Sequence, residues 1–410
     1  MIKAGSLLYA VYVCLLISIF SATLLFIFTV SIEFSARQSI KERLIDRCES
    51  CLNFYLSDSN NFNDLKPEMI DIFGDGLVCE FIKTRWGAYT SLNVKAFFKS
   101  DTVQKIGLVG ESNTENKLAL YISDLGEELK LSGATSIKGN MQLPREGHKT
   151  VNILGNNQLN KPVVNGHISI SEHTLPKLAF GRAIFLDGEK WISFSQVKNQ
   201  STIFRSFKKE TLIINLENGE RIEDINIKGN IIIKSNDTLY IERTAKIEDV
   251  IVNAPKVVIN DGFHGNMQIF ADKEIVLGER VKLDYPSSLV IYPDKDGFDK
   301  KITISTRSEV YGGVLIEGES FDEKENNKIR VDEGALIIGD LYCNGKLQLQ
   351  GKVIGSVYAH KLEMETESGD YGNLLLNASI EADNLPNDFI RLPLFAQDKK
   401  LMYGMVKYLW

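Results

Sequence analysis

The first long pattern in the chain is an apolar run without a charged residue. It fills residues 6–32 with the sequence SLLYAVYVCLLISIFSATLLFIFTVSI. As a helix rising about 1.5 Å per residue, such a run is longer than the ~30 Å hydrocarbon core of a bilayer. A secretory signal has a shorter apolar region that ends at a small-residue cleavage motif. The run therefore predicts a transmembrane helix over 6–32, with membrane lipid as its partner.

The helical pattern continues past the apolar run. No Pro or Gly occurs between this run and the segment SDSNNFND at 57–64, whose residue types favour turns. An apolar residue recurs at every fourth position, namely at Ile40, Leu44, Cys48 and Leu52. This spacing places the four side chains on one face of a helix. We therefore predict a helical extension over 33–58.

Apolar and polar residues alternate in short runs between 60 and 210, which is typical of half-buried strands. Gly133 and Gly139 stand where the chain needs corners. Asp187 and Gly188 lie between two apolar runs and predict a hairpin turn. The pattern predicts a β-rich domain over 60–210, or the beginning of the repeats that follow.

Strand-like apolar cores return at long intervals between 211 and 365. Two series show the interval: Leu239, Val257 and Ile275 are 18 residues apart, and Ile231, Ile251 and Ile269 are 20 and 18 apart. One such unit cannot bury its own inward side chains, so neighbouring units must cover one another. We therefore predict a β-solenoid over 211–365 with the second series stacked inward. A β-sandwich, with strands every 8–12 residues, is the alternative.

The corners and the end of these repeats have their own signals. Asn-Asp-Gly at 260–262 and Asn-Gly at 344–345 are residue types suited to tight turns. Residues 366–410 carry prolines and several aromatic residues, unlike the repeats. Because an open end would recruit other chains, we interpret 366–410 as a C-terminal cap, with a docking segment as the alternative. The predicted fold class is mainly β: an N-terminal transmembrane α-helix, a β-rich domain and a β-solenoid.

Composition narrows the class of protein. The 410 residues carry a net charge of −7 without a basic stripe, which argues against nucleic acid as a partner. Five cysteines are too few for a disulfide scaffold. Cys48 and Cys51 form a C-x-x-C motif within the predicted helix. They either pair with each other, if the body is exported, or remain thiols on the helix face.

Candidate catalytic chemistry is sparse. Asp294, Asp296 and Asp299 surround a glycine, but an EF-hand loop needs Gly at position six and Glu at position twelve, so a solvated turn fits better. His167 and His173 fall on one face of a predicted strand, where a surface role is expected. Acidic residues are scattered rather than gathered into an acid/base pair. We predict no enzyme activity, no catalytic, cofactor-binding or metal-binding residue, and no cofactor.

The amino-terminal sequence KAGSLLYAVYVCLLISIFSATLL resembles that of minor pilins and pseudopilins of type IV pilus and type II secretion systems. The resemblance implies a leader of residues 1–5, cleaved between Gly5 and Ser6, and partners among other pilus-like or envelope subunits. Most pilins carry Glu at the fifth mature position, which is Ala10 here, and some minor tip members also lack it. An uncleaved signal anchor is the alternative.

The segment GDLYCNGKLQLQGKVIGSVYAHKL resembles bactofilins, which are polymer-forming bacterial cytoskeletal β-helices. Four cations between Arg37 and Arg47 follow the apolar run, whereas only Lys3 precedes it, and the positive-inside rule then favours a cytoplasmic body. The pilin resemblance implies the opposite orientation.

These patterns together predict a structural component of a bacterial envelope assembly. It would be anchored in the inner membrane by a single span, with a periplasmic or extracellular body. The alternatives are a bactofilin-like scaffold on the cytoplasmic side and an anchored carbohydrate-active β-helix enzyme. The sequence does not identify a ligand.

Overall fold

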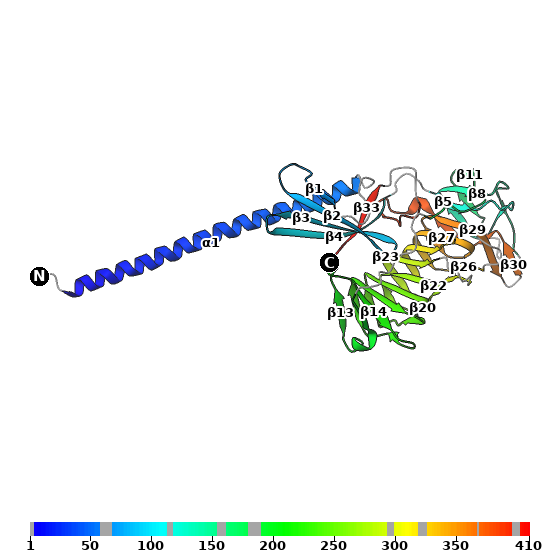
Figure 1. The fold of residues 1–410 in the computed structure, drawn as a ribbon. Coiled ribbons are helices and arrows are strands. Elements are labelled where there is room, and N and C mark those ends of the chain that lie inside the picture. The colour runs from blue at the N-terminus through cyan, green and yellow to red at the C-terminus, as the bar shows by residue number, and fades with distance from the viewer. Residues whose placement is uncertain are drawn as a thin grey trace. The chain divides into compact units, whose positions relative to one another are not determined.

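The computed structural model describes residues 4–57, 68–112, 118–153, 161–178, 190–292, 299–318, 326–366, 369–395 and 402–410. The chain divides into two compact units (Figure 1). The first contains residues 1–83 and 93–105, and the second contains 84–92 and 106–410. Most of the described chain is β-strand, with one long apolar helix at the amino terminus. The coarse fold class predicted from the sequence is therefore confirmed.

The first unit is built on helix α1 (Ala4–Ser57) and a sheet of strand order β1-β2-β3-β4. The strands are β1 (Glu68–Ile70), β2 (Val78–Trp86), β3 (Tyr89–Phe98) and β4 (Asp101–Glu111), and the last three continue into the second unit. Within the first unit, Leu44, Cys48 and Leu52 are buried, as the predicted apolar stripe requires, and Ile40 is half-buried. One helix therefore covers both the predicted span and the predicted extension.

The second unit contains the remaining strands. Those before residue 200 are β5 (Leu118–Ile122), β6 (Leu129–Ser132), β7 (Ser136–Lys138), β8 (Asn140–Leu143), β9 (His148–Thr150), β10 (Val163–Asn165), β11 (Ile168–Ile170) and β12 (Lys190–Ser193). A short 3-10 helix, η2 (Phe194–Gln196), follows β12.

The strands of the repeat region follow in order. They are β13 (Thr202–Arg205), β14 (Leu212–Leu216), β15 (Arg221–Ile222), β16 (Asn226–Gly229), β17 (Ile231–Ser235), β18 (Thr238–Ile241), β19 (Lys246–Glu248), β20 (Val250–Ile259), β21 (His264–Gly265), β22 (Met267–Leu277), β23 (Lys282–Ile291), β24 (Lys301–Ile304), β25 (Glu309–Ile316), β26 (Lys328–Val331), β27 (Leu336–Leu349), β28 (Lys352–Ile354), β29 (Val357–Thr366), β30 (Gly369–Gly372), β31 (Leu374–Leu376), β32 (Ser379–Glu381) and β33 (Tyr403–Leu409), with η3 (Ala382–Asn384) after β32.

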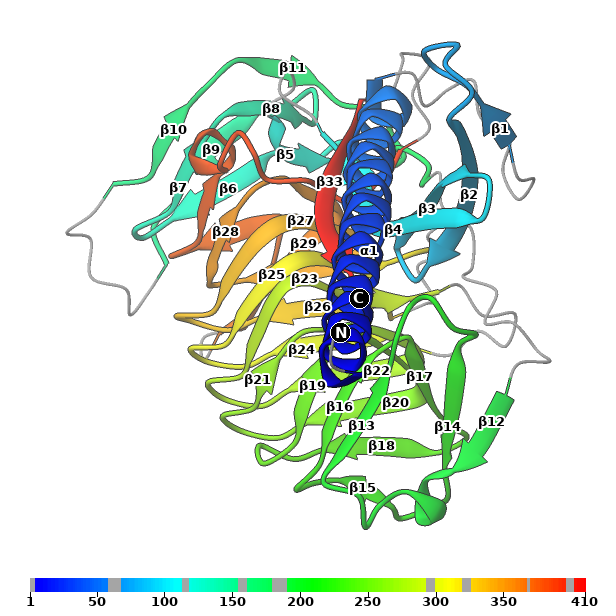
Figure 2. The ribbon, with the colours of Figure 1, turned by 90° about the vertical axis from the view of Figure 1, so that its left-hand side faces the viewer.

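Most of these strands pair in parallel with the strand that lies one repeat earlier or later, forming what we call the parallel stack (Figure 2). Leu239 pairs with Val257, and Val257 pairs with Ile275, so the 18-residue interval of this series is confirmed. Large apolar side chains from all its repeats gather in one cluster, which we call the interior. Because each β-branched side chain covers the one below it, the stack is stabilised by contacts between neighbouring repeats.

The second predicted series is out of register by one residue. Ile269 pairs with Val252, and Ile251 pairs instead with Ile232 and Gln268. Ile231 and Ile269 belong to the interior, whereas Ile251 lies in a different cluster on the outer side of the sheet. Successive side chains of a strand point to opposite faces, so a slip of one residue moves a side chain from one face to the other. The inward placement predicted for Ile251 is wrong.

The order of the stack also differs from the predicted domain boundaries. β12 pairs with β14 and β13 with β16, so parallel pairing crosses residue 210. β5 pairs with β29, β6 with β31 and β7 with β32. Residues 118–153 and 161–170 therefore extend the stack beyond its last repeats rather than preceding its first. Because this pairing joins segments far apart in the chain, a local interval cannot reveal it.

The carboxy-terminal residues are not a separate cap. β31 and β32 are members of the parallel pairing. β33 pairs antiparallel with β4, from Tyr403 opposite Glu111 to Leu409 opposite Ile106. The interpretation of 366–410 as a cap on the last repeat is therefore wrong, because strands within 118–153 and 161–170 cover that end.

The predicted corners have mixed outcomes. Gly133 and Gly139 have positive φ values of 63° and 125°, as corners built on glycine require. Gly262 also has a positive φ, of 73°, within a turn. Asn344 and Gly345 instead lie inside β27, at a shift in its register with β29. The hairpin predicted at Asp187 and Gly188 lies outside the described residues.

Candidate functional sites

The amino-terminal half of α1 is a candidate membrane anchor. The long helix α1 is drawn in blue in Figure 1. Its apolar side chains are exposed from Leu7 to Phe34, and the helix is long and apolar enough to cross a bilayer. Three hydroxyl groups in this half donate hydrogen bonds to carbonyl groups one turn earlier: Ser18 to Cys14, Thr23 to Ile19 and Thr29 to Leu25. Such internal bonds allow polar side chains to lie in hydrocarbon.

The carboxy-terminal half of α1 is linked covalently to the sheet of the first unit. Cys51 forms a disulfide with Cys79 of β2, and their Cα atoms are 6.8 Å apart. The two cysteines of the C-x-x-C motif therefore do not pair with each other. Cys48 remains a buried thiol, its Sγ 3.3 Å from the carbonyl oxygen of Val103, and burial raises the pKa of this thiol. A thiol with a raised pKa reacts slowly.

Arg47 makes a second link between α1 and the rest of the first unit. Its Nη2 donates to Oδ2 of Asp75 at 2.5 Å, and its guanidinium lies 4.2 Å from the ring centre of Phe73. The Arg47 side chain is only 8% exposed. The disulfide and this buried pair hold the helix against the chain segment that leads into β2.

The parallel stack has one outer face that is covered by other parts of the second unit. Two columns of side chains in register run along it. The first column is Ile213, Ile232, Ile251, Gln268, Ser288, Gly313 and Asp340. The second is Asn215, Lys234, Asn253, Phe270, Val290, Leu315, Tyr342, Tyr358, Tyr121 and Gln142. We call this surface the covered face.

The apolar members of both columns pack against residues 84–92, the end of β33 and the segment 390–395, which form the cover. Each part of the cover also bonds to a buried polar side chain of the stack or its edge. Gln268 accepts from the Ala88 amide at 2.7 Å and donates to the Trp86 carbonyl at 3.1 Å, Asp249 accepts from Lys407 at 2.8 Å, and Asp340 accepts from Arg391 at 3.0 Å. These pairs fix which segment lies over which repeat.

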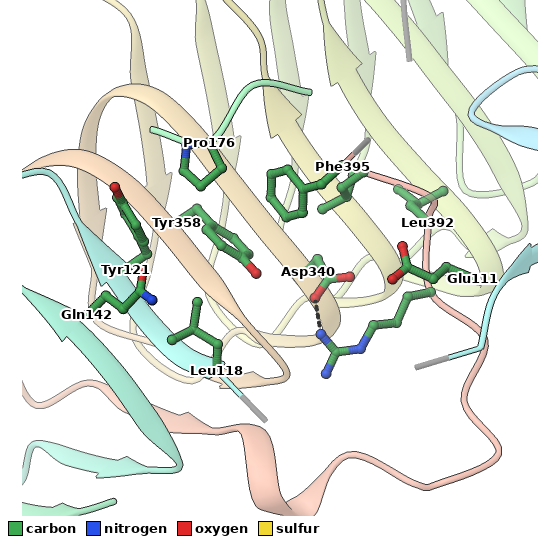
Figure 3. Close-up of a pocket in the computed structure, with 11 residues that line it drawn as sticks. Glu111, Leu118, Tyr121, Gln142, Pro176, Asp340, Tyr358, Leu392 and Phe395 are labelled. Atoms are coloured by element: carbon green, nitrogen blue, oxygen red, sulfur yellow. Dashed lines mark hydrogen bonds and ion pairs between the residues drawn. The ribbon is translucent and has the colours of Figure 1, made fainter. Parts of the chain in front are cut away.

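A cavity of about 190 Å³ lies on the covered face next to Asp340 (Figure 3). Its apolar walls are Leu118, Tyr121, Pro176, Tyr358, Leu392, Leu394 and Phe395. The ring centres of Tyr358 and Phe395 are 4.9 Å apart in an edge-to-face arrangement, and those of Tyr358 and Tyr121 are 6.1 Å apart. Polar groups come from Glu111, Gln142, Asp340 and Arg391.

The charged groups of the cavity are linked through Arg391. Its Nη1 donates to Oδ1 of Asp340 at 3.0 Å and to Oγ of Ser356 at 2.9 Å. The backbone groups of Arg391 and Glu111 exchange hydrogen bonds of 2.8 and 2.9 Å. Glu111 comes from β4, Asp340 from β27 and Arg391 from the cover, so three distant segments meet at this point.

Burial sets the ionisation of the two acids. It raises the pKa of Glu111 to about 7, and the nearby Asp340 adds to the rise while Arg391 opposes it. Burial also raises the pKa of Asp340, against the effects of Arg391 and Ser356. The cavity can therefore hold a carboxyl group that is largely protonated below neutral pH, beside a carboxylate paired with a guanidinium.

The residues singled out in the sequence lie elsewhere. Gly5 and Ser6 are exposed near the start of α1. His167 and His173 are exposed in the second unit. Asp294 and Asp296 lie outside the described residues, and Asp299 is exposed. Among the residues that the structure describes, no group of three His, Cys, Asp or Glu side chains could hold a metal ion.

Sequence reasoning missed the three charged residues of the cavity. One signal for them was present: Asp340 interrupts the apolar run ALIIGDLYC, and a carboxylate in a strand buried on both faces needs a partner. No spacing could identify Arg391 or Glu111 as neighbours. No protein-family model, curated protein or solved structure matches this chain, so its function has to be inferred from the anchor and the covered face.

Proposed function

We propose that this protein is a structural subunit of a bacterial envelope assembly, anchored in the inner membrane by residues 6–32, with its body on the periplasmic or extracellular side. The observation that carries the proposal is the division of α1 into two halves. One half exposes its apolar side chains, and the other buries one face in the first unit and is joined to it by a disulfide.

The exposed half of α1 needs a cover. Leaving its apolar surface in water would cost about 25 cal/mol for each Å². Lipid, or the matching helices of neighbouring subunits, removes this cost. The Cys51–Cys79 disulfide and the Arg47–Asp75 pair make the helix and the sheet one mechanical piece. A force on the anchor therefore reaches the folded part directly, which suits a subunit of an assembly and agrees with the resemblance to minor pilins.

The disulfide also favours an exported body. Disulfides persist in oxidising compartments and are rare in the cytoplasm. A bactofilin-like scaffold on the cytoplasmic side would keep Cys51 and Cys79 under reducing conditions. The cations that favour the opposite orientation are partly engaged within the first unit, since Arg37 bonds to Glu33 at 2.7 Å and Arg47 to Asp75 at 2.5 Å.

We further propose that the parallel stack is a β-solenoid that the anchor displays. Parallel partners at 16 residues, as for Tyr342 and Tyr358, and at 27 residues, as for Ile302 and Ile329, support repeats of variable length around one interior. Variation in length is expected where corners carry insertions and the strands keep their register.

Membrane orientation can be tested in native cells. Protease added to spheroplasts should digest the body, and Cys51 and Cys79 should react with a maleimide only after reduction. Cys343→Ser serves as the control, because Cys343 is a buried thiol outside the first unit. A body that resists protease until the membrane is lysed, with Cys51 and Cys79 alkylated without reductant, would contradict the proposal.

Processing separates a pilin-like subunit from a simple signal anchor. If a prepilin-type peptidase cuts the leader, mass spectrometry of the membrane-purified protein will find Ser6 at the amino terminus, and Gly5→Leu will leave the leader attached. An intact Met1 in the wild-type protein would contradict the hypothesis of a pilin-like subunit and would leave the hypothesis of an uncleaved signal anchor.

A further inference from the structure

The size of the cavity limits what it can bind. Sites for drug-sized molecules have volumes of roughly 300–1,000 Å³. The cavity beside Asp340 measures about 190 Å³. A single six-membered ring with its substituents is therefore the largest occupant that fits without movement of the cover.

The balance of charge argues against an ion as the occupant. Arg391 is the one cation among the described lining residues, and it is paired with Asp340 at 3.0 Å. The Glu111 side chain is buried and, below neutral pH, carries little charge because its pKa is about 7. At such a pH an anion or a cation would lose its hydration and meet no net opposite charge, which is unfavourable in a buried site.

The polar groups can still form hydrogen bonds with a neutral ligand. Nε of Arg391 is buried and has no hydrogen-bond partner within the described part of the chain. Gln142 lies at the same cavity, and an amide can both donate and accept. Glu111 and Asp340 add carboxyl oxygens toward the other end of the cavity, away from Gln142 (Figure 3). The cavity therefore presents donors and acceptors at both ends.

The walls between these ends are apolar and partly aromatic. Tyr358 and Phe395 meet edge to face with their ring centres 4.9 Å apart, Pro176 lies near them, and Leu118 lines the cavity across from Pro176 (Figure 3). A pyranose ring has the matching character, because its C–H faces are apolar and its rim carries hydroxyl groups. We propose that this cavity binds one neutral saccharide ring, either a free sugar or the terminal residue of a glycan.

The experiment uses the full-length protein in a detergent without a sugar headgroup, since a glycosidic detergent would compete. The probes are the methyl glycosides of glucose, galactose and N-acetylglucosamine, followed by saturation-transfer NMR and calorimetry. At least one probe should bind saturably. An oligosaccharide ending in that sugar should bind at least as well if the natural ligand is a glycan end, and should fail to bind if only a free sugar enters.

Two variants connect binding to the cavity. Arg391→Lys keeps the charge opposite Asp340 and removes Nε, and should weaken binding about tenfold or more. Arg280→Lys makes the same chemical change at an exposed arginine and should leave binding unchanged. If Arg391→Lys does not fold, Gln142→Met decides in its place, since it keeps the side-chain length and removes the amide.

Three outcomes would overturn the proposal. The first is that none of the three glycosides binds. The second is that acetate or phosphate displaces the bound sugar, which would identify a site for anions. The third is that both cavity variants bind the sugar as tightly as the wild-type protein. The position of the body relative to the membrane does not affect any of these measurements, so the proposal stands or falls separately from the proposed function.

Discussion

The interior and the covered face of the parallel stack are both buried, yet they are built on different rules. In the interior, apolar residues succeed one another from repeat to repeat, as in Leu239, Val257 and Ile275. On the covered face, the first column changes from isoleucine to polar residues after Ile251, beginning with Gln268. The interior therefore has the same apolar character in every repeat, whereas the residue types of the covered face differ from one repeat to the next.

This difference separates stability from specificity. A uniform interior stabilises each repeat against its neighbour and does not distinguish one repeat from another. The buried polar groups of the covered face do distinguish the repeats, because each bonds to one particular segment of the cover. Burying such groups contributes little net stability, but leaving one without its partner is costly. The predictions below test this division, from the largest expected effect to the smallest.

Removing one partner of the buried ion pair should have the largest effect. Arg391→Ala leaves the Asp340 carboxylate buried without its cation and should lower the free energy of unfolding by about 3–5 kcal/mol. Replacing both residues, in Arg391→Leu with Asp340→Asn, should recover part of this loss. Urea unfolding of the purified protein measures both. A double variant less stable than Arg391→Ala would show that the two residues also stabilise the fold through contacts other than those with each other.

Truncation in the interior should come next. Ile269→Ala opens a hole between neighbouring repeats and should cost about 2–5 kcal/mol. Ile251→Ala removes the same atoms from the covered face. Hydrogen exchange should separate the two, with protection lost in the strands around Ile269 in the first variant and also in the cover at 84–92 in the second. Identical exchange patterns in the two variants would contradict the distinction between the interior and the covered face.

The pH dependence of stability should reveal Glu111. Its pKa is about 7 when folded and near 4.5 when unfolded, so the folded state binds the proton more tightly. Its contribution is complete below pH 4.5 and is lost as the pH rises through 7. Glu111→Gln should therefore be more stable than wild type by about 1–3 kcal/mol at pH 8 and nearly equal at pH 4.5.

Glu381 provides a control of opposite sign. Burial acts to raise its pKa, but bonds from Lys352, Asn384 and Lys138 prevail and lower it to about 2. Its contribution is present above pH 4.5 and is lost as the pH falls toward 2. Glu381→Gln should therefore destabilise the protein at neutral pH. Two profiles of the same sign would contradict the assignment of these two environments.

The smallest effect is expected outside both surfaces. Lys273 is exposed on β22, and Lys273→Ala should change the free energy of unfolding by no more than about 0.5 kcal/mol in either direction. Chemical denaturation next to Ile269→Ala tests it. A cost comparable to that of the isoleucine would mean that the exposed side of β22 packs against something in solution.

Sequence reasoning predicted the local residue patterns and missed the contacts between segments that are distant in the chain. The long apolar helix, the apolar stripe at Leu44 and the 18-residue series through Val257 are local patterns, and all three are found in the structure. The prediction for Ile251 is wrong because both faces of its strand are apolar. The alternation of residues along the strand therefore does not indicate which face lies in the interior. The pairings of β5 with β29 and of Arg391 with Asp340 depend on tertiary structure alone.

The position of residues 118–153 and 161–170 at the far end of the stack has a consequence for synthesis. These residues leave the ribosome early, and Leu120 can pair on one side with Met141 of β8, but its partner on the other side, Val357, is made much later. β4 likewise pairs with β33, the last strand of the chain. Contacts this distant slow folding and leave strand edges exposed in the meantime. A nascent chain stalled before β29 would leave one edge of β5 and one edge of β4 without a partner strand, so chaperones that bind exposed strand edges should be most needed while the second half of the chain is still being made.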